Sequence, residues 1–233
     1  MTIRRRTLTD VSSPYAAAMP VVGFLHTSPA HVARFDALAA ELAPECATAV
    51  VVDELLLSAA RRSGVDDPGV RDGISAALAD LLHAGARVVV CTCSTIGAVA
   101  EQLGDECGAR VVRVDRPMIE SALGAGRRIA AVVAVESTAA PTRALIESVA
   151  AARSAAAEIS IVVSEGAWAR FEAGDIEGYL QSIADTCDSL DGSVDVIVLA
   201  QASMADAADR VGGATPVLSS PRLAVSAAAE LAR

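Results

Sequence analysis

Short apolar runs alternate along the chain with longer segments whose apolar residues recur every three to four positions. The short runs are typical of buried strands, and the longer segments are typical of amphipathic helices. Strands that alternate with helices favour right-handed βαβ units and a parallel sheet covered on both faces. The predicted strands are residues 21–25, 49–52, 88–91, 111–114, 129–135, 159–163, 196–199 and 216–218, and the predicted helices include 31–42, 73–84, 142–152 and 176–190.

These strands form two sets of four that resemble each other at an offset of about 110 residues, which is typical of a duplicated α/β half. The sequence therefore predicts an α/β fold of two pseudo-symmetric Rossmann-like halves, each a four-stranded parallel sheet flanked by helices. The matched segments are His26–Ser28 with Glu136–Thr138, Val52–Glu54 with Val163–Glu165, Val88–Thr95 with Val196–Met204, and Asp115–Pro117 with Ser219–Pro221.

The sequence also indicates a leader and the boundaries of the two halves. Residues 1–19 contain Arg, Thr, Ser and Pro instead of a continuous apolar core, so we interpret them as a flexible leader and not as an export signal. The first half is predicted to cover residues 20–126, with its terminal helix free to cross over, and the second half to cover residues 127–233. No segment has the length and continuous apolarity of a membrane span.

Composition excludes several kinds of chemistry. All 19 basic residues are arginines, so the lysine that pyridoxal phosphate, Schiff-base catalysis and phosphate loops require is absent, and we expect no cofactor. A formal net charge of -10 opposes binding to nucleic acid. Five cysteines without an export signal indicate reduced thiols in the cytoplasm, and a lone Cys-x-Cys pair supplies too few ligands for a metal. Assembly into a homo-oligomer stays open.

Polar residues follow the predicted strands where each strand ends. Ligands of open parallel sheets bind beyond these carboxyl ends, where helix N-termini offer free N–H groups to an anion. We therefore expect a small carboxylate-containing substrate, although Ser and Thr at such positions also serve simply as helix caps. The candidate binding residues are Thr27, Ser28, Thr92, Ser94, Thr95, Glu136, Ser137, Thr138, Gln201, Ala202 and Ser203.

Two of these strand ends resemble motifs of a known family. The first, VVVCTCSTIGAVAEQL, is similar to the first-half motif of aspartate and glutamate racemases, with Cys93, Ser94 and Thr95 on the positions of Cys-Asn-Thr. The second, VIVLAQASMADAA, is similar to the Leu-Gly-Cys-Ala-Gly-Met motif of hydantoin racemases. The chain thus resembles the aspartate/glutamate racemase superfamily from about Val21 to its end, with maleate isomerases and arylmalonate decarboxylases as relatives.

The resemblance implies a cofactor-independent enzyme with its active site in the cleft between the halves. In this family two cysteines on opposite faces of a carboxylate exchange one α-proton, which implies Cys93 as thiolate base or nucleophile, with Cys91 as the alternative reading. The second family cysteine falls on Gln201, which cannot transfer a proton, so His26 and Glu136 become candidates for the missing acid or base.

Three functions follow from this departure. The first is an isomerase or racemase that acts next to a carboxylate, and it is the one that membership of the family favours. The second is a decarboxylase that uses a single cysteine, as the arylmalonate decarboxylases do. The third is a non-catalytic binder of small carboxylates that has kept the cleft and lost one thiol.

Overall fold

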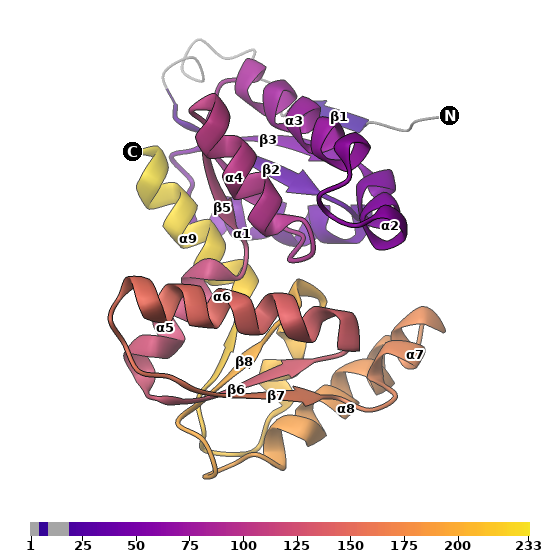
Figure 1. Ribbon diagram of the computed structural model, residues 1–233, viewed down its shortest axis with the longest axis vertical. Coiled ribbons are helices and arrows are strands. Elements are labelled where there is room, and N and C mark those ends of the chain that lie inside the picture. Colours follow the sequence, from indigo (N-terminus) through magenta and orange to yellow (C-terminus); the bar gives the residue numbers. More distant parts are fainter. Residues whose placement is uncertain (1–4, 9–18) are drawn as a thin grey trace. The chain divides into compact units, whose positions relative to one another are not determined.

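The computed structural model describes residues 5–8 and 19–233, which form two compact units (Figure 1). The first unit holds the described chain up to Val114 together with Pro221–Arg233, and the second unit holds Asp115–Ser220. This division differs from the predicted boundary at residue 126, because residues 115–126 belong to the second unit, and the chain re-enters the first unit at its end. The remaining residues of the predicted leader, 1–4 and 9–18, lie outside the described part of the chain.

The first unit is built on a five-stranded sheet with strand order β1-β3-β2-β4-β5. Its four later strands are parallel, as predicted, whereas β1 pairs antiparallel with β3 at the edge. β1 falls within the predicted leader, because its four residues show no apolar alternation that would indicate a strand. The strands are β1 (Arg5–Leu8), β2 (Val21–His26), β3 (Ala47–Val52), β4 (Ala86–Cys91) and β5 (Arg110–Arg113).

The second unit contains a four-stranded parallel sheet with strand order β7-β6-β8-β9. Its first strand along the chain lies between the second and the third, and the same is true of β3-β2-β4-β5 in the first unit. This shared order confirms the predicted architecture of two α/β halves with parallel sheets. The strands are β6 (Arg128–Val133), β7 (Glu158–Val163), β8 (Val196–Leu199) and β9 (Val217–Ser219).

Helices connect the strands in both units (Figure 1). The four predicted helices are present, and α3 starts earlier than predicted because Asp67 caps it by accepting the N–H groups of Gly69 and Val70. No helix in the described part of the chain is long and apolar enough to cross a membrane. The helices are α1 (Val32–Leu42), α2 (Glu54–Ser63), α3 (Pro68–His83), α4 (Gly97–Cys107), α5 (Arg116–Ala125), α6 (Ala139–Ala152), α7 (Ala167–Glu172), α8 (Ile176–Asp188) and α9 (Ser220–Ala232), with 3-10 helices η2 (Pro29–His31), η3 (Glu136–Thr138) and η4 (Ala202–Arg210).

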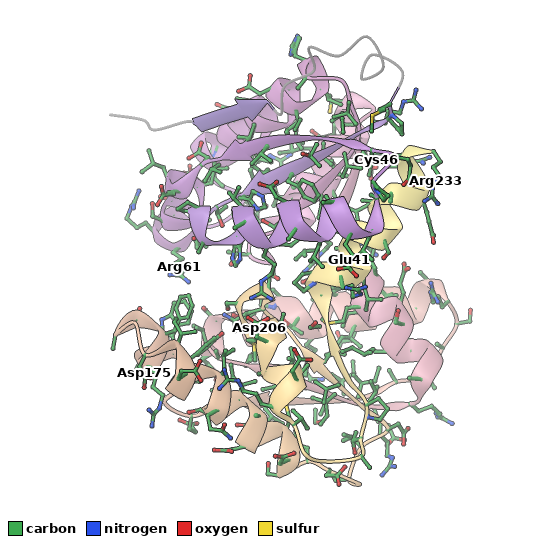
Figure 2. All side chains as sticks on the ribbon, turned by 180° about the vertical axis from the view of Figure 1, so that it is seen from behind. Glu41, Cys46, Arg61, Asp175, Asp206 and Arg233 are labelled. Carbon is green, nitrogen blue, oxygen red and sulfur yellow. The ribbon has the colours of Figure 1, made fainter. Side chains whose placement is uncertain are left out.

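Both faces of the first sheet are buried. Leu25 of β2 faces one apolar cluster with residues of α2, α3 and α4, while its neighbour Phe24 faces the opposite cluster with residues of α1 and α9. The C-terminal helix α9 completes this second layer, and Arg233 at its end pairs with Glu45 next to Cys46 (Figure 2). The first unit is therefore completed by the last residues of the chain.

Gly126, which follows α5, lies close to Asp195, which precedes β8. This contact allows the packing of the second unit to be tested by substitution. A Cβ at Gly126 would lie 2.3 Å from the Cβ of Asp195, whose carboxylate accepts the N–H groups of Arg127 and Arg128 at 2.9 Å each. We expect Gly126→Ala to lower the free energy of unfolding by about 2 kcal/mol, because Asp195 must move. Urea unfolding measures the change.

The matched control is Gly124→Ala, two residues earlier in α5. No atom lies within 4 Å of a Cβ at Gly124, so this variant is expected to gain about 0.5 kcal/mol from the higher helix propensity of alanine. Equal effects of the two substitutions would contradict the explanation by steric contact.

Candidate functional site

Backbone hydrogen bonds show which residues correspond at the carboxyl ends of the two sheets. The N–H of Thr92 donates to the carbonyl oxygen of Leu25 at 3.0 Å, and the N–H of Ala200 donates to that of Val132 at 3.0 Å. Thr92 and Ala200 thus hold equivalent places, directly after β4 and β8. The residue that follows Thr92 is Cys93, and its counterpart in the second unit is the residue that follows Ala200.

That counterpart is Gln201, in agreement with the match between the two sequence segments. A second match, between His26 and Glu136, is wrong by three residues. The carbonyl oxygen of His26 accepts the N–H of Asp53 at 2.9 Å, and that of Val133 accepts the N–H of Ser164 at 2.8 Å. His26 therefore corresponds to Val133, and the similar run of polar residues after each strand had concealed the shift.

The two neighbouring cysteines of the first unit differ in exposure. Cys91 ends β4, has 0% exposed surface, lies in the apolar cluster, and points its thiol at the carbonyl oxygen of Cys93 at 3.7 Å. Cys93 lies in the turn that follows, belongs to the same apolar cluster, and is also buried, with 9% of its surface exposed. Cys93 is therefore the slightly more exposed of the two thiols.

His26 fixes the end of β2 from inside the first unit. Its Nδ1 lies 2.8 Å from Oγ1 of Thr92, and the Thr92 hydroxyl donates to the carbonyl oxygen of Leu25 at 3.1 Å, so Nδ1 carries the proton. The ring is fully buried beside Phe35, with 5.4 Å between ring centres. Burial, with a smaller effect of nearby His31, lowers the pKa of His26 to about 3.

A neutral, enclosed imidazole does not exchange protons with a ligand near neutral pH, so the predicted catalytic use of His26 is not supported. Its Nε2 is buried and has no hydrogen-bond partner among the described residues. His26 instead serves to hold Thr92, and through it the beginning of the turn that carries Cys93.

The buried imidazole predicts a pH dependence of stability. In the unfolded chain His26 titrates near its usual pKa of 6.5, whereas in the folded chain its pKa is about 3. Below the higher value the unfolded state binds a proton that the folded state does not, so stability is lost as the pH falls from 6.5 towards 3. We expect His26 to account for a decrease of about 2 kcal/mol between pH 7 and pH 5.

Urea unfolding at a series of pH values measures this loss. The comparison is His26→Gln, which keeps a donor for Thr92 and does not titrate, and which is expected to show a shallower decrease of stability with falling pH. An unchanged decrease in the variant would show that His26 is not the group responsible.

The remaining polar candidates of the first unit divide into capping and uncommitted hydroxyls. Ser28 caps η2, because its hydroxyl oxygen accepts the backbone N–H of Ala30 at 3.3 Å. Thr27 and Thr95 form no side-chain hydrogen bond within the described residues, and α4 starts after Ile96 without a side-chain cap. Ser94 lies partly exposed in the same turn. Thr27 and Thr95 therefore keep hydroxyls that no cap uses, on the segments that follow β2 and β4.

The second unit presents an amide at the place of the thiol. Oε1 of Gln201 accepts the N–H of Ala134 at 2.8 Å, which fixes the amide orientation and leaves the Nε2 hydrogens as donors. Within the described residues Nε2 forms no hydrogen bond. Ala202 is buried next to it, and Ser203 is partly exposed, with its Oγ 2.9 Å from the hydroxyl of Tyr179.

The 3-10 helix after β6 carries the other candidates of the second unit. Glu136 and Ser137 are exposed, and Thr138 precedes α6 without a capping hydrogen bond from its side chain. Because this helix is displaced by three residues from the end of β6, Glu136 is not the counterpart of His26. It is available to solvent and is not held by another described side chain.

Sequence reasoning missed two buried residues near these strand ends. Arg113 ends β5, is paired in register with Cys91, and is only 4% exposed. Arg113 lies against Gly97 at the start of α4, and a Cβ added to Gly97 would lie 2.9 Å from the Cβ of Arg113. The second buried residue that was missed is Tyr179 of α8. A lone arginine or tyrosine in a strand or helix gives no sequence signal of such a contact. No group of His, Cys, Asp and Glu among the described residues is arranged to hold a metal ion.

Comparison with known proteins gives one family and several similar folds. The family model for Asp/Glu/hydantoin racemases matches residues 21–228. No curated protein sequence matches the chain. The aspartate racemase of Picrophilus torridus has 12% identity and a TM-score of 0.69, covering 91% of this chain and 94% of its own.

Two further structures extend the comparison. The allantoin racemase of Pseudomonas fluorescens has 18% identity and a TM-score of 0.62, covering 91% of this chain and 90% of its own. An arylmalonate decarboxylase has 16% identity and a TM-score of 0.56, covering 91% and 92%. At such low identities these similarities show the fold, while the assignment to a family comes from the match over residues 21–228.

Proposed function

The chain belongs to the Asp/Glu/hydantoin racemase family, and from this premise we propose that it is a cofactor-independent isomerase that moves a proton at the carbon next to a carboxylate, with Cys93 as its base. Membership of the family supports an enzyme of the isomerase type. The observation that carries the finer proposal is that a thiol, Cys93, and an amide, Gln201, occupy equivalent positions after a strand in their respective units.

The position of Cys93 supports its use as a base. It follows the central strand β4, lies in the turn before α4, and is more exposed than Cys91. A thiolate is the form of a cysteine side chain that accepts a proton. We call the residues at the strand ends of each unit a half-site, with Cys93, Thr27 and Thr95 in the first and Gln201 and Ser203 in the second. The hydroxyls of Thr27 and Thr95, which form no hydrogen bond within the described residues, supply donors for a substrate carboxylate in the first half-site.

Gln201 supports a complementary role in the second half-site. When the thiolate removes the α-proton, the electron pair moves onto the carboxylate, and the resulting enediolate carries extra negative charge on oxygen. The oriented Nε2 donors of Gln201 suit that oxygen, since Oε1 is already held by Ala134. We propose that the proton is then returned to the α-carbon from water, on the face opposite to the Cys93 thiol, because return from Cys93 itself would give back the starting acid.

Gln201 also favours a second candidate, a decarboxylase of malonate-like acids. There the bond to the departing carboxylate breaks, carbon dioxide leaves, and the carbanion takes a single proton from the Cys93 thiol. Only one proton-transfer group is needed, which fits a family member whose second thiol position holds an amide. The fold of the arylmalonate decarboxylase is similar to that of this chain.

Incubation in deuterium oxide with D- and L-aspartate, D- and L-glutamate, hydantoins and substituted malonates tests both candidates. Deuterium at the α-carbon of an otherwise unchanged acid, detected by mass spectrometry, is the expected result for the isomerase. Carbon dioxide released from a malonate supports the decarboxylase instead. Thermal stabilisation by an acid that is never turned over would contradict both and leave a carboxylate-binding protein.

A further inference from the structure

Tyr179 of α8 contacts the second half-site directly, although it lies outside the candidate residues of the sequence. Its side chain is fully buried, and its hydroxyl lies 2.9 Å from Oγ of Ser203, two residues after Gln201. Burial raises the pKa of Tyr179 to about 12, so the phenol keeps its proton near neutral pH. The partner of the phenol, Ser203, is itself partly exposed.

The chemistry of the two hydroxyls indicates the direction of this hydrogen bond. A phenol is a better donor than an aliphatic hydroxyl, and within the described residues Ser203 is the partner of the Tyr179 hydroxyl. When Tyr179 donates to Oγ, the single hydrogen of Ser203 is left to point at a ligand. A hydroxyl that accepts one hydrogen bond becomes a stronger donor in the next.

The corresponding place in the first unit is occupied differently. Asp67 caps α3 and Asp175 caps α8, and each of these helices comes directly before the strand, β4 or β8, that leads to Cys93 or Gln201. Four residues after the cap, α3 carries Arg71, which pairs with Glu106 at 3.3 Å, whereas α8 carries Tyr179. The tyrosine is therefore particular to the half-site that holds Gln201, and is not a packing residue repeated in both units.

A row of contacting aromatic rings leads from the buried Tyr179 to the partly exposed Trp168. The ring of Phe171 lies 5.0 Å from that of Tyr179, and the ring of Trp168 lies 5.0 Å from that of Phe171. Trp168 is the only tryptophan of the chain. Two ring contacts and one hydrogen bond link Trp168 to Ser203. We therefore expect the fluorescence of Trp168 to respond to a change at Ser203.

We propose that Tyr179 is a positioning residue that holds the Ser203 hydroxyl as a donor to an oxyanion of a small carboxylic acid. This inference rests on the proposed function of the same site, since it assumes that the second half-site receives a carboxylate. It adds a residue, a donor and a spectroscopic consequence that the family resemblance does not supply.

The test is titration calorimetry with malonate, D- and L-aspartate and D- and L-glutamate, together with the emission of Trp168. For an acid that binds the wild-type protein, Tyr179→Phe is expected to raise Kd roughly tenfold, because the ring stays and only the hydroxyl is lost. The change in Trp168 emission on binding should disappear, while the emission without ligand is retained. Ser203→Ala should weaken binding to a similar extent, and the double variant should be no weaker.

Thr186→Val is the matched control, because it removes a hydrogen bond of the same helix, from Thr186 to Ser164 at 3.0 Å, and should leave Kd unchanged. Binding that is unaffected by Tyr179→Phe would overturn the inference alone. Additive effects in the double variant would also overturn it, because Tyr179 would then act independently of Ser203. Failure of every acid to bind the wild-type protein would overturn the proposed carboxylate site and the inference with it.

Discussion

Cys93→Ala is expected to lower kcat/KM by about a thousandfold or more, because it removes the group that takes the α-proton. The substitution removes one sulfur from a residue of the turn that is 9% exposed, so the cavity it leaves in the apolar cluster is small. Stability should therefore change much less than activity. Deuterium incorporation into the substrate and urea unfolding of the same variant measure the two effects separately.

Two other thiols serve as controls for this experiment. Cys107 is exposed at the end of α4, and Cys107→Ala is expected to alter neither rate nor stability. Cys91→Ala should lower the free energy of unfolding by about 1 kcal/mol, since it leaves a small cavity in a closely packed cluster. If Cys93→Ala retained deuterium exchange at the wild-type rate, Cys93 would not be the base and the proposed function would fail.

The sequence predicted the strands well because each buried strand of a parallel sheet is a continuous apolar run with a polar residue at its end. Cys93 and Gln201 were matched for the same reason, as each is the second residue after such a run. The match of His26 with Glu136 failed because polar turns lack that constraint, and two runs of Ser and Thr align equally well when shifted. The backbone hydrogen bonds of Asp53 and Ser164 were needed to correct it.

The features that the sequence missed depend on contacts between distant segments. The return of α9 to the first unit places residues such as Ala228 in the same cluster as Phe24, which no local pattern encodes. Tyr179 reaches Ser203 only because α8 packs against η4, and a buried tyrosine in an amphipathic helix looks like any other core residue. The burial of His26 is similar, since exposure at a strand end is set by the helix that covers it.

Gln201→Glu is expected to reduce kcat/KM about a hundredfold, mostly through a higher KM. The carboxylate of the variant can still accept the N–H of Ala134, which Oε1 of Gln201 accepts at 2.8 Å, so the strand end keeps its geometry. The substitution removes both N–H donors and places a negative charge where the proposal puts the substrate carboxylate. Like charges at one site repel, and an oxyanion without its donor loses much of its stabilisation.

Steady-state kinetics with the acid that exchanges deuterium measures this effect, and Gln102→Glu is the matched control. Gln102 lies exposed on α4 and pairs with Glu106, so its substitution adds the same charge to the chain away from the strand ends. KM should rise for Gln201→Glu alone. An equal rise in both variants would indicate a general effect of net charge, and an unchanged KM would place the substrate carboxylate away from Gln201.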